Sequence, residues 1–247
     1  MAAAGVSYGS RNDVTERSSP SVKAAVVDYG LGNLFSVRRA CEHVGMEVVV
    51  TPRKEEILGT DVVILPGVGA FGDAMATLRR LDLVEVLRDI ANSDRPLIGI
   101  CLGIQLLMSE SCEFGVHKGL GIIEGSVVRF ENPQERKRLL KVPQVQWNRI
   151  FHPNHRRQEG DPWRDTPLAG LAEGEFMYFV HSFYVRPTDP SVTLSVSRYG
   201  DVEFCSALRW RNVFACQFHP ERSGSAGLLV YRNVASAVGQ ARGGSAA

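Results

Sequence analysis

The sequence of 247 residues lacks long apolar runs, closely spaced cysteine pairs and an excess of charge of one sign. No apolar run approaches the roughly 20 residues that span a membrane. Lys and Arg number 28 against 27 for Asp and Glu, which gives a formal net charge of +1. Proteins dedicated to nucleic acids or to acidic membranes carry a marked basic excess. We therefore expect neither a nucleic acid nor a membrane as a partner.

Cysteine is scarce and unpaired. The five cysteines are Cys41, Cys101, Cys112, Cys205 and Cys216. An odd number without a CxxC pair argues against a zinc site and against the disulfide framework of a secreted protein. The sequence thus indicates a cytoplasmic protein with reduced thiols, most of them buried as apolar packing. We expect no metal and no cofactor.

Small residues mark both ends of the chain. The sequence as a whole has the composition of one globular domain, with 44% hydrophobic and 22% charged residues. The N-terminal stretch has no apolar block and so does not resemble a secretion signal. We expect a disordered N-terminal tail over residues 1–21, one domain over 22–238 and a C-terminal tail over 239–247.

The first half of the domain alternates between short β-rich runs and stretches of helical periodicity. The predicted strands are 22–28, 47–51, 61–65 and 97–100, and the predicted helices are 34–45, 74–92 and a third that begins near residue 103. Alternation of this kind is typical of βαβ units, which form a mainly parallel sheet with helices on both faces.

The second half, from about residue 121, has strands without long helices between them. These predicted strands are 122–130, 176–180, 193–198, 205–209 and 213–217. Such runs are typical of antiparallel hairpins that extend one edge of a sheet. The predicted fold is a single α/β domain with a mainly parallel central sheet, helices on both faces and antiparallel strands added in the C-terminal half.

The segment around Cys101 carries the clearest chemical signal. An apolar strand runs into Gly99-Ile100-Cys101-Leu102-Gly103 and then a helix, which is the nucleophile-elbow pattern with Cys in place of Ser. The flanking glycines leave room for neighbouring backbone in a sharp turn. We predict that Cys101 is a nucleophile and that the backbone N–H of Leu102 binds an oxyanion.

A base and a carboxylate follow late in the chain, in the order Cys, His, Glu. His219 and Glu221 are two residues apart after a predicted strand, and residues at this spacing face the same way in extended backbone. Pro220 favours that extended geometry for His219. We predict that His219 is the base and that Glu221 orients it.

A glycine-rich loop over residues 67–72 matches GxGxxG after a predicted strand. A dinucleotide site is rejected, because no acidic residue stands at the end of the next strand to bind a ribose. The loop instead offers a second oxyanion donor from Gly67, Val68 or Gly69.

Together these residues resemble the class I glutamine amidotransferases, in which such an elbow is paired with a late His-Pro-Glu. More narrowly, the chain is similar to the glutaminase subunits of imidazole glycerol phosphate synthases. The segments that carry this resemblance are 28–34, 66–71, 101–105, 147–148, 181–184 and 217–224.

The resemblance implies hydrolysis of glutamine to glutamate and ammonia by a Cys-His-Glu triad. It implies that Gln105 and Glu113 hold the amino-acid end of glutamine, together with backbone at Ser182 and Phe183. It also implies a heterodimer with a (β/α)8 cyclase, to which ammonia passes during histidine biosynthesis to give imidazole glycerol phosphate and an aminoimidazole carboxamide ribotide. The residues near that interface would be Asn33, Trp147 and Asn148.

Two alternatives remain open at the level of sequence. One is a stand-alone γ-glutamyl Cys hydrolase of related fold, which would need no partner. The other is an inactive scaffold that only binds the cyclase.

Overall fold

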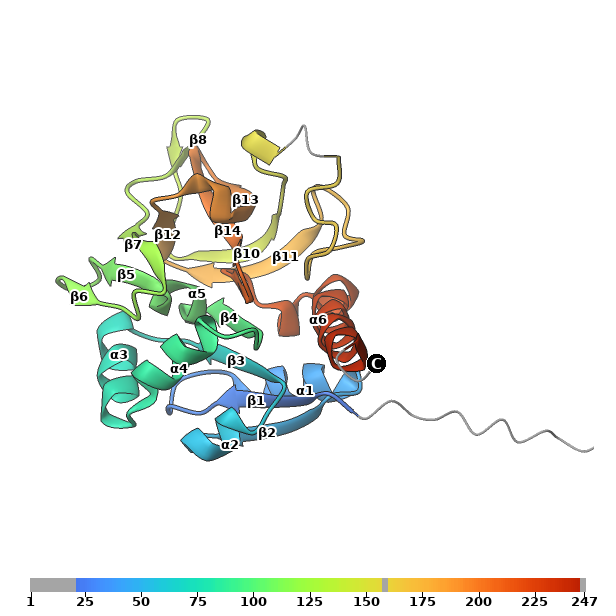
Figure 1. The fold of residues 1–247 in the computed structure, drawn as a ribbon. Coiled ribbons are helices and arrows are strands. Elements are labelled where there is room, and N and C mark those ends of the chain that lie inside the picture. The colour runs from blue at the N-terminus through green and yellow to red at the C-terminus, as the bar shows by residue number, and fades with distance from the viewer. Residues whose placement is uncertain (1–20, 157–159, 245–247) are drawn as a thin grey trace, which may run out of the picture.

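The computed structural model describes residues 21–156 and 160–244 (Figure 1). The predicted N-terminal tail lies outside the described residues, apart from Ser21. The elements of the first half are β1 (Lys23–Val27), α1 (Leu34–His43), β2 (Glu47–Thr51), α2 (Lys54–Leu58), β3 (Val62–Gly67), α3 (Phe71–Arg80), α4 (Leu83–Ala91), β4 (Leu97–Cys101) and α5 (Leu102–Leu106).

The second half is mostly strand and ends in a long helix. Its elements are β5 (Met108–Ser111), β6 (His117–Lys118), β7 (Ile123–Arg129), β8 (Gln134–Glu135), β9 (Arg138–Leu139), β10 (Gln144–Arg149), β11 (Phe176–His181), β12 (Phe183–Pro187), β13 (Thr193–Tyr199), β14 (Val202–Trp210), β15 (Val213–Cys216) and α6 (Gly224–Gly244). Short 3₁₀ turns lie at Asn154–Arg156, Pro190–Val192 and Pro220–Arg222.

One large sheet runs through the molecule in the order β2-β1-β3-β4-β15-β14-β12-β7-β5-β6, and β13 pairs with β14. The strands from β2 to β15 are parallel, whereas β14, β12 and β7 continue the sheet in antiparallel fashion. The predicted fold class is therefore confirmed. Figure 1 shows the helices gathered around the parallel part, with the antiparallel strands beyond it.

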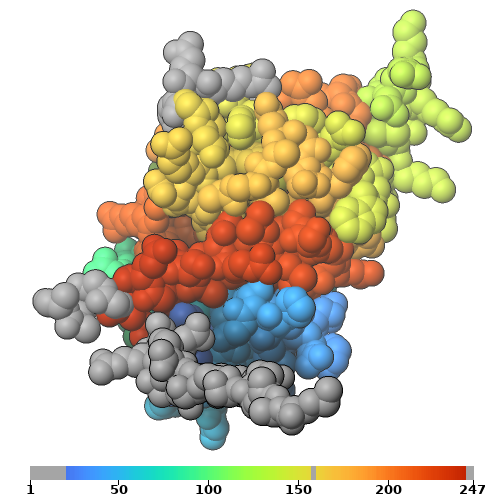
Figure 2. Space-filling view, turned by 90° about the vertical axis from the view of Figure 1, so that its right-hand side faces the viewer, coloured from blue at the N-terminus to red at the C-terminus, as the bar shows by residue number. Residues whose placement is uncertain are grey.

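Two apolar layers, one on each face of the sheet, bury the parallel strands. β3 and β4 are buried along their whole lengths, as expected for parallel strands between layers of helices. One layer brings α1 and α6 onto the sheet, and the other brings α3, α4 and α5. Figure 2 shows α6 lying between α1 and the segment that leads into β11.

The predicted helix over 74–92 is wrong as a single element. It forms two helices, α3 and α4, because Asp82 adopts a left-handed conformation with φ of 53° and turns the chain between them. The helix α6 was not predicted, and it continues to Gly244, past the expected start of the C-terminal tail at residue 239. The expectation of buried thiols fails at Cys112, which is exposed. No helix in the described ranges is long and apolar enough to cross a membrane.

Candidate active site

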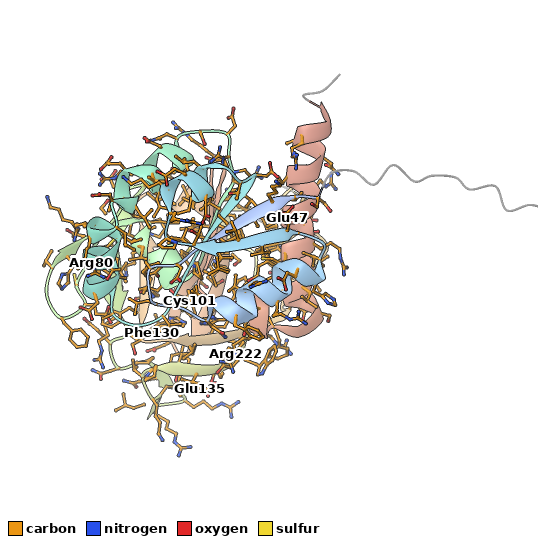
Figure 3. The ribbon with its side chains drawn as sticks, turned by 90° about the horizontal axis from the view of Figure 1, so that it is seen from below. Glu47, Arg80, Cys101, Phe130, Glu135 and Arg222 are labelled. Atoms are coloured by element: carbon orange, nitrogen blue, oxygen red, sulfur yellow. The ribbon has the colours of Figure 1, made fainter. Side chains whose placement is uncertain are left out.

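Cys101 stands at the junction of β4 and α5, in a backbone conformation with φ of 55° and ψ of −105°. The two neighbouring glycines are needed for steric reasons. A Cβ on Gly103 would lie 1.9 Å from the Leu65 carbonyl oxygen, and one on Gly99 would lie 2.9 Å from the Ala215 Cβ. The elbow therefore packs directly against β3 and β15. Figure 3 shows Cys101 near the middle of the molecule, away from the peripheral Arg80 and Glu47.

His219 and Glu221 form a buried hydrogen-bonded pair. His219 Nδ1 lies 2.8 Å from Glu221 Oε1, and the two side chains are 5% and 1% exposed. The carboxylate accepts, so Nδ1 carries the proton of this bond. The His219 backbone is extended, with φ of −102° and ψ of 94°, and Pro220 begins the following 3₁₀ turn. This is the geometry that the His-Pro-Glu spacing predicts.

The second ring nitrogen of His219 is available for chemistry. Nε2 is buried, and because Nδ1 is taken by Glu221, Nε2 is the ring nitrogen that can share a proton with Cys101. Burial alone would lower the pKa of His219. The charge of Cys101 and hydrogen bonding to it, together with the Glu221 carboxylate, outweigh burial and raise the pKa to about 10. When the sulfur carries a charge, the imidazole therefore holds the proton beside it, as in a thiolate–imidazolium pair.

Two further groups approach the sulfur of Cys101. The Val180 carbonyl oxygen and the Gln217 Nε2 each lie 3.8 Å from Sγ. The carbonyl accepts from the thiol, whereas the amide donates to the sulfur. Neither residue was assigned a role from the sequence, because neither stands in a local pattern that indicates a chemical role.

A small cavity of about 230 Å³ opens beside Cys101. Its lining residues are Val68, Gly69, Cys101, Leu102, Gln105, Glu113, Val180, His181, Ser182 and Phe183. It thus brings the predicted nucleophile together with two of the three predicted loop residues and all four predicted glutamine-binding residues. The third loop residue, Gly67, does not line the cavity but pairs with Cys101 in the sheet register.

The loop after β3 is held by a buried tyrosine. The Tyr29 hydroxyl donates to the Pro66 carbonyl oxygen at 2.7 Å. A Cβ on Gly67 would lie 2.1 Å from the same hydroxyl and 2.9 Å from the Leu102 Cβ, so only glycine fits there. Gly69 has a φ of 101°, which favours glycine. Gly67 therefore packs directly against Leu102 of the elbow.

Polar side chains set the far end of the cavity. Glu113 Oε2 accepts from the Phe71 N–H at 2.6 Å, at the start of α3. Gln105 Nε2 donates to the Phe183 carbonyl and to Gln217 Oε1, both at 3.1 Å. A carboxylate and an amide therefore line the cavity, and such groups can form hydrogen bonds with an amino acid.

His181 is a further cavity residue without a predicted role. Its Nδ1 donates to the Phe183 carbonyl at 2.8 Å. Burial lowers the pKa of His181 to about 4; the hydrogen bond to Phe183 opposes this shift, and the charge of His219 adds to it. The ring is therefore neutral and fixes the turn that bears Ser182.

The three predicted interface residues lie apart from the catalytic atoms. Asn33 Oδ1 accepts from the Ser36 N–H and caps α1, and Asn148 Nδ2 donates to the Arg198 carbonyl. Trp147 is 50% exposed and meets Tyr178 edge-on with ring centroids 6.0 Å apart. The ring centroids of Tyr178 and His219 in turn lie 6.3 Å apart, so Trp147 is linked to the site by packing through Tyr178. No cluster of three or more potential metal ligands occurs within 21–156 and 160–244.

Fold and site define an α/β protein with a Cys-His-Glu arrangement beside a small polar cavity. Residues 25–233 match the family model of class-I glutamine amidotransferases. The chain belongs to the class-I glutamine amidotransferase family and is a glutamine amidotransferase.

Curated relatives align over almost their whole lengths. The imidazole glycerol phosphate synthase subunit HisH of Rhodopirellula baltica is 43% identical over 212 residues, which cover 86% of this chain and 96% of that protein. The subunit of the same name from Syntrophotalea carbinolica is 46% identical over 211 residues, which cover 84% and 97%.

Solved structures share the fold. A crystal structure of a glutamine amidotransferase aligns with a TM-score of 0.64 at 20% identity, over 87% of this chain and 98% of that one. The structure of PurLQS from Thermotoga maritima aligns with a TM-score of 0.63 at 21% identity, over 87% and 97%. At such identities the likeness concerns the fold alone.

Proposed function

We propose that the chain is the glutaminase subunit of an imidazole glycerol phosphate synthase. The observation that carries the proposal is the His219–Glu221 pair beside Cys101 at a cavity lined by Gln105 and Glu113, in a chain whose curated relatives are named HisH. The amidotransferase domain is taken as residues 22–238, together with the continuation of α6.

Glutamine binds with its side-chain amide carbon against Cys101 Sγ. Its amino-acid end lies at Gln105 and Glu113 and along the backbone of Ser182 and Phe183, which line the same cavity. The ammonium group needs acceptors and the carboxylate needs donors. The Glu113 carboxylate and the Gln105 amide oxygen provide acceptors, and backbone N–H groups provide donors.

Hydrolysis proceeds through a thioester. His219 holds the proton of the thiol, and the thiolate attacks the amide carbon to give a tetrahedral oxyanion. The oxyanion is stabilised by the Leu102 N–H and by an N–H of the loop from Gly67 to Gly69. His219 passes its proton to the leaving nitrogen, and the C–N bond breaks to release ammonia. Water, deprotonated by His219, then cleaves the γ-glutamyl thioester to glutamate, and the thiol is regenerated.

The partner is the (β/α)8 cyclase subunit, with which the chain forms a heterodimer in the cytoplasm. Asn33, Trp147 and Asn148 belong to this interface. The cyclase uses the ammonia to make imidazole glycerol phosphate and aminoimidazole carboxamide ribotide for histidine biosynthesis.

The decisive measurement is glutamate release by the complex with the cyclase, with and without the cyclase substrate. We expect the rate to rise when partner and substrate are present, and Cys101→Ala to abolish it. Glutamate release that persists in Cys101→Ala would contradict the proposed nucleophile. Rapid turnover of γ-glutamyl peptides without any partner would instead identify a stand-alone hydrolase. A glutamine-analogue electrophile that leaves Cys101 unmodified would identify an inactive scaffold.

A further inference from the structure

The side chain of Gln217 is fully buried beside the nucleophile, although the mechanism above gives it no role. It follows β15 directly, and its backbone N–H donates to the Ser206 carbonyl at 2.9 Å. Its Nε2 lies 3.8 Å from Cys101 Sγ. Gln217 stands two residues before His219. The amide of Gln217 and the imidazole of His219 therefore approach the sulfur from the same segment.

The orientation of this amide follows from a chain of donors and acceptors. The Phe183 carbonyl can only accept, so the Gln105 atom that lies 3.1 Å away must be the nitrogen. The same NH₂ group has a second hydrogen, which points at Gln217 at 3.1 Å. Gln217 must therefore present its oxygen to Gln105. Its own NH₂ group is left facing Cys101.

A donor at this position acts differently on the two forms of the sulfur. The thiol donates to the Val180 carbonyl, 3.8 Å from Sγ. After the proton leaves, this carbonyl repels the thiolate, whereas the Gln217 N–H attracts it. The attraction is strong in a buried site, because a low local dielectric strengthens hydrogen bonds to charged groups.

We propose that Gln217 is a further catalytic residue, whose amide N–H binds Cys101 Sγ and stabilises the thiolate in an orientation set by Gln105 and the Phe183 carbonyl. This inference rests on the proposed function in so far as Cys101 is the nucleophile. It adds a thiolate donor that is separate from the oxyanion donors. It also connects the residue that holds the amino-acid end of glutamine, Gln105, to the reacting sulfur.

The test is the rate of Cys101 alkylation by iodoacetamide between pH 6 and 10, which requires neither glutamine nor a partner. All proteins carry Cys112→Ser, because Cys112 is the exposed thiol among the five. Gln217→Glu keeps the shape but puts a carboxylate oxygen where the N–H was. We expect its alkylation rate at neutral pH to fall by about tenfold or more, with the pH profile moved to higher pH. Gln217→Met removes the donor without adding charge, and we expect a smaller decrease.

Two controls keep the test specific. Gln146→Glu makes the same chemical change at an exposed glutamine of β10, and its alkylation profile should match that of the parent. Gln217→Glu should lower the thermal stability at pH 8 less in a Cys101→Ala background than in the parent. In that background the sulfur is absent, so it cannot repel the new carboxylate.

The proposal is overturned if Gln217→Glu and Gln217→Met alkylate at the parental rate across the pH range. It is also overturned if Gln217→Glu is equally destabilising with and without the Cys101 sulfur. Neither result would contradict the proposed glutaminase function. That function is tested separately, by whether Cys101→Ala abolishes glutamate release.

Discussion

His181 makes the stability of the chain depend on pH in the acid range. Its pKa is lowered by burial to about 4 in the folded chain, whereas an unfolded histidine titrates near pH 6.5. As pH falls through 6.5, the histidine binds a proton in the unfolded chain but stays neutral in the folded chain. Stability contributed by neutral His181 is therefore lost between pH 6.5 and about 4, by up to roughly 3 kcal/mol.

The measurement is urea unfolding from pH 7 to pH 4 of the parent and of His181→Asn, which keeps an N–H donor but does not titrate. We expect the free energy of unfolding of the variant to fall less steeply as the pH is lowered. His155→Gln, at an exposed histidine, should keep the parental slope. Equal slopes for the parent and His181→Asn would contradict a buried neutral histidine.

The three proposed triad residues could be predicted from the sequence because each stands in a recognisable local pattern. Cys101 lies between two glycines, and His219 and Glu221 flank a proline. The role of Gln217 could not be predicted in this way. It depends on contacts among Gln105, Phe183 and Gln217, which only the folded chain brings within 3.1 Å.

At the scale of elements, the elbow between β4 and α5 tolerates no Cβ at Gly103. Gly103 lies in α5, where alanine is favoured by helix propensity, but its Cβ would lie 1.9 Å from the Leu65 carbonyl oxygen. We expect Gly103→Ala to lower the free energy of unfolding by about 3 kcal/mol or more through displacement of β3 or α5. Urea unfolding measures the loss.

Gly45 provides the matched comparison, because its φ is +88° and nothing lies within 4 Å of the added Cβ. Gly45→Ala should therefore cost only the backbone strain, about 1 kcal/mol. If the two variants lose the same stability, close packing of the elbow is not what requires Gly103.

Helical periodicity predicted the location of helices better than their breaks. The apolar spacing continues from α3 into α4, and only the left-handed Asp82 separates them. The helix α6 carries small residues at its start, where Gly227 packs so closely that a Cβ would lie 1.9 Å from the Pro220 carbonyl oxygen. Its position depends on that contact, which apolar periodicity does not report.

At the scale of the whole molecule, strand order could be predicted only in part. The parallel first half follows from alternating strands and helices, but β15 returns from the end of the chain to lie between β4 and β14. This return places His219 beside Cys101, more than one hundred residues earlier in the sequence. The sheet therefore completes the site only when the last strand is in place.

We expect the exposed face of β10 to serve assembly with the proposed cyclase partner rather than the stability of the chain. Val145 and Trp147 are 54% and 50% exposed, and residues two apart on a strand share a face. A half-exposed tryptophan in an interface can contribute about 2 kcal/mol, which corresponds to roughly a thirtyfold change in Kd. We expect Trp147→Ala to weaken cyclase binding by about that factor while thermal stability changes little.

Titration with the cyclase gives Kd, and Phe114→Ala provides the control, because Phe114 is 88% exposed on the loop between β5 and β6. A parental Kd for Trp147→Ala would contradict its place in the interface.

The rate of glutamate release at saturating cyclase distinguishes an effect on binding from an effect on activation of the site. Trp147 packs on Tyr178, which lies beside His219. We therefore expect the saturated rate of Trp147→Ala to stay below that of the parent, whereas Phe114→Ala should reach the full rate.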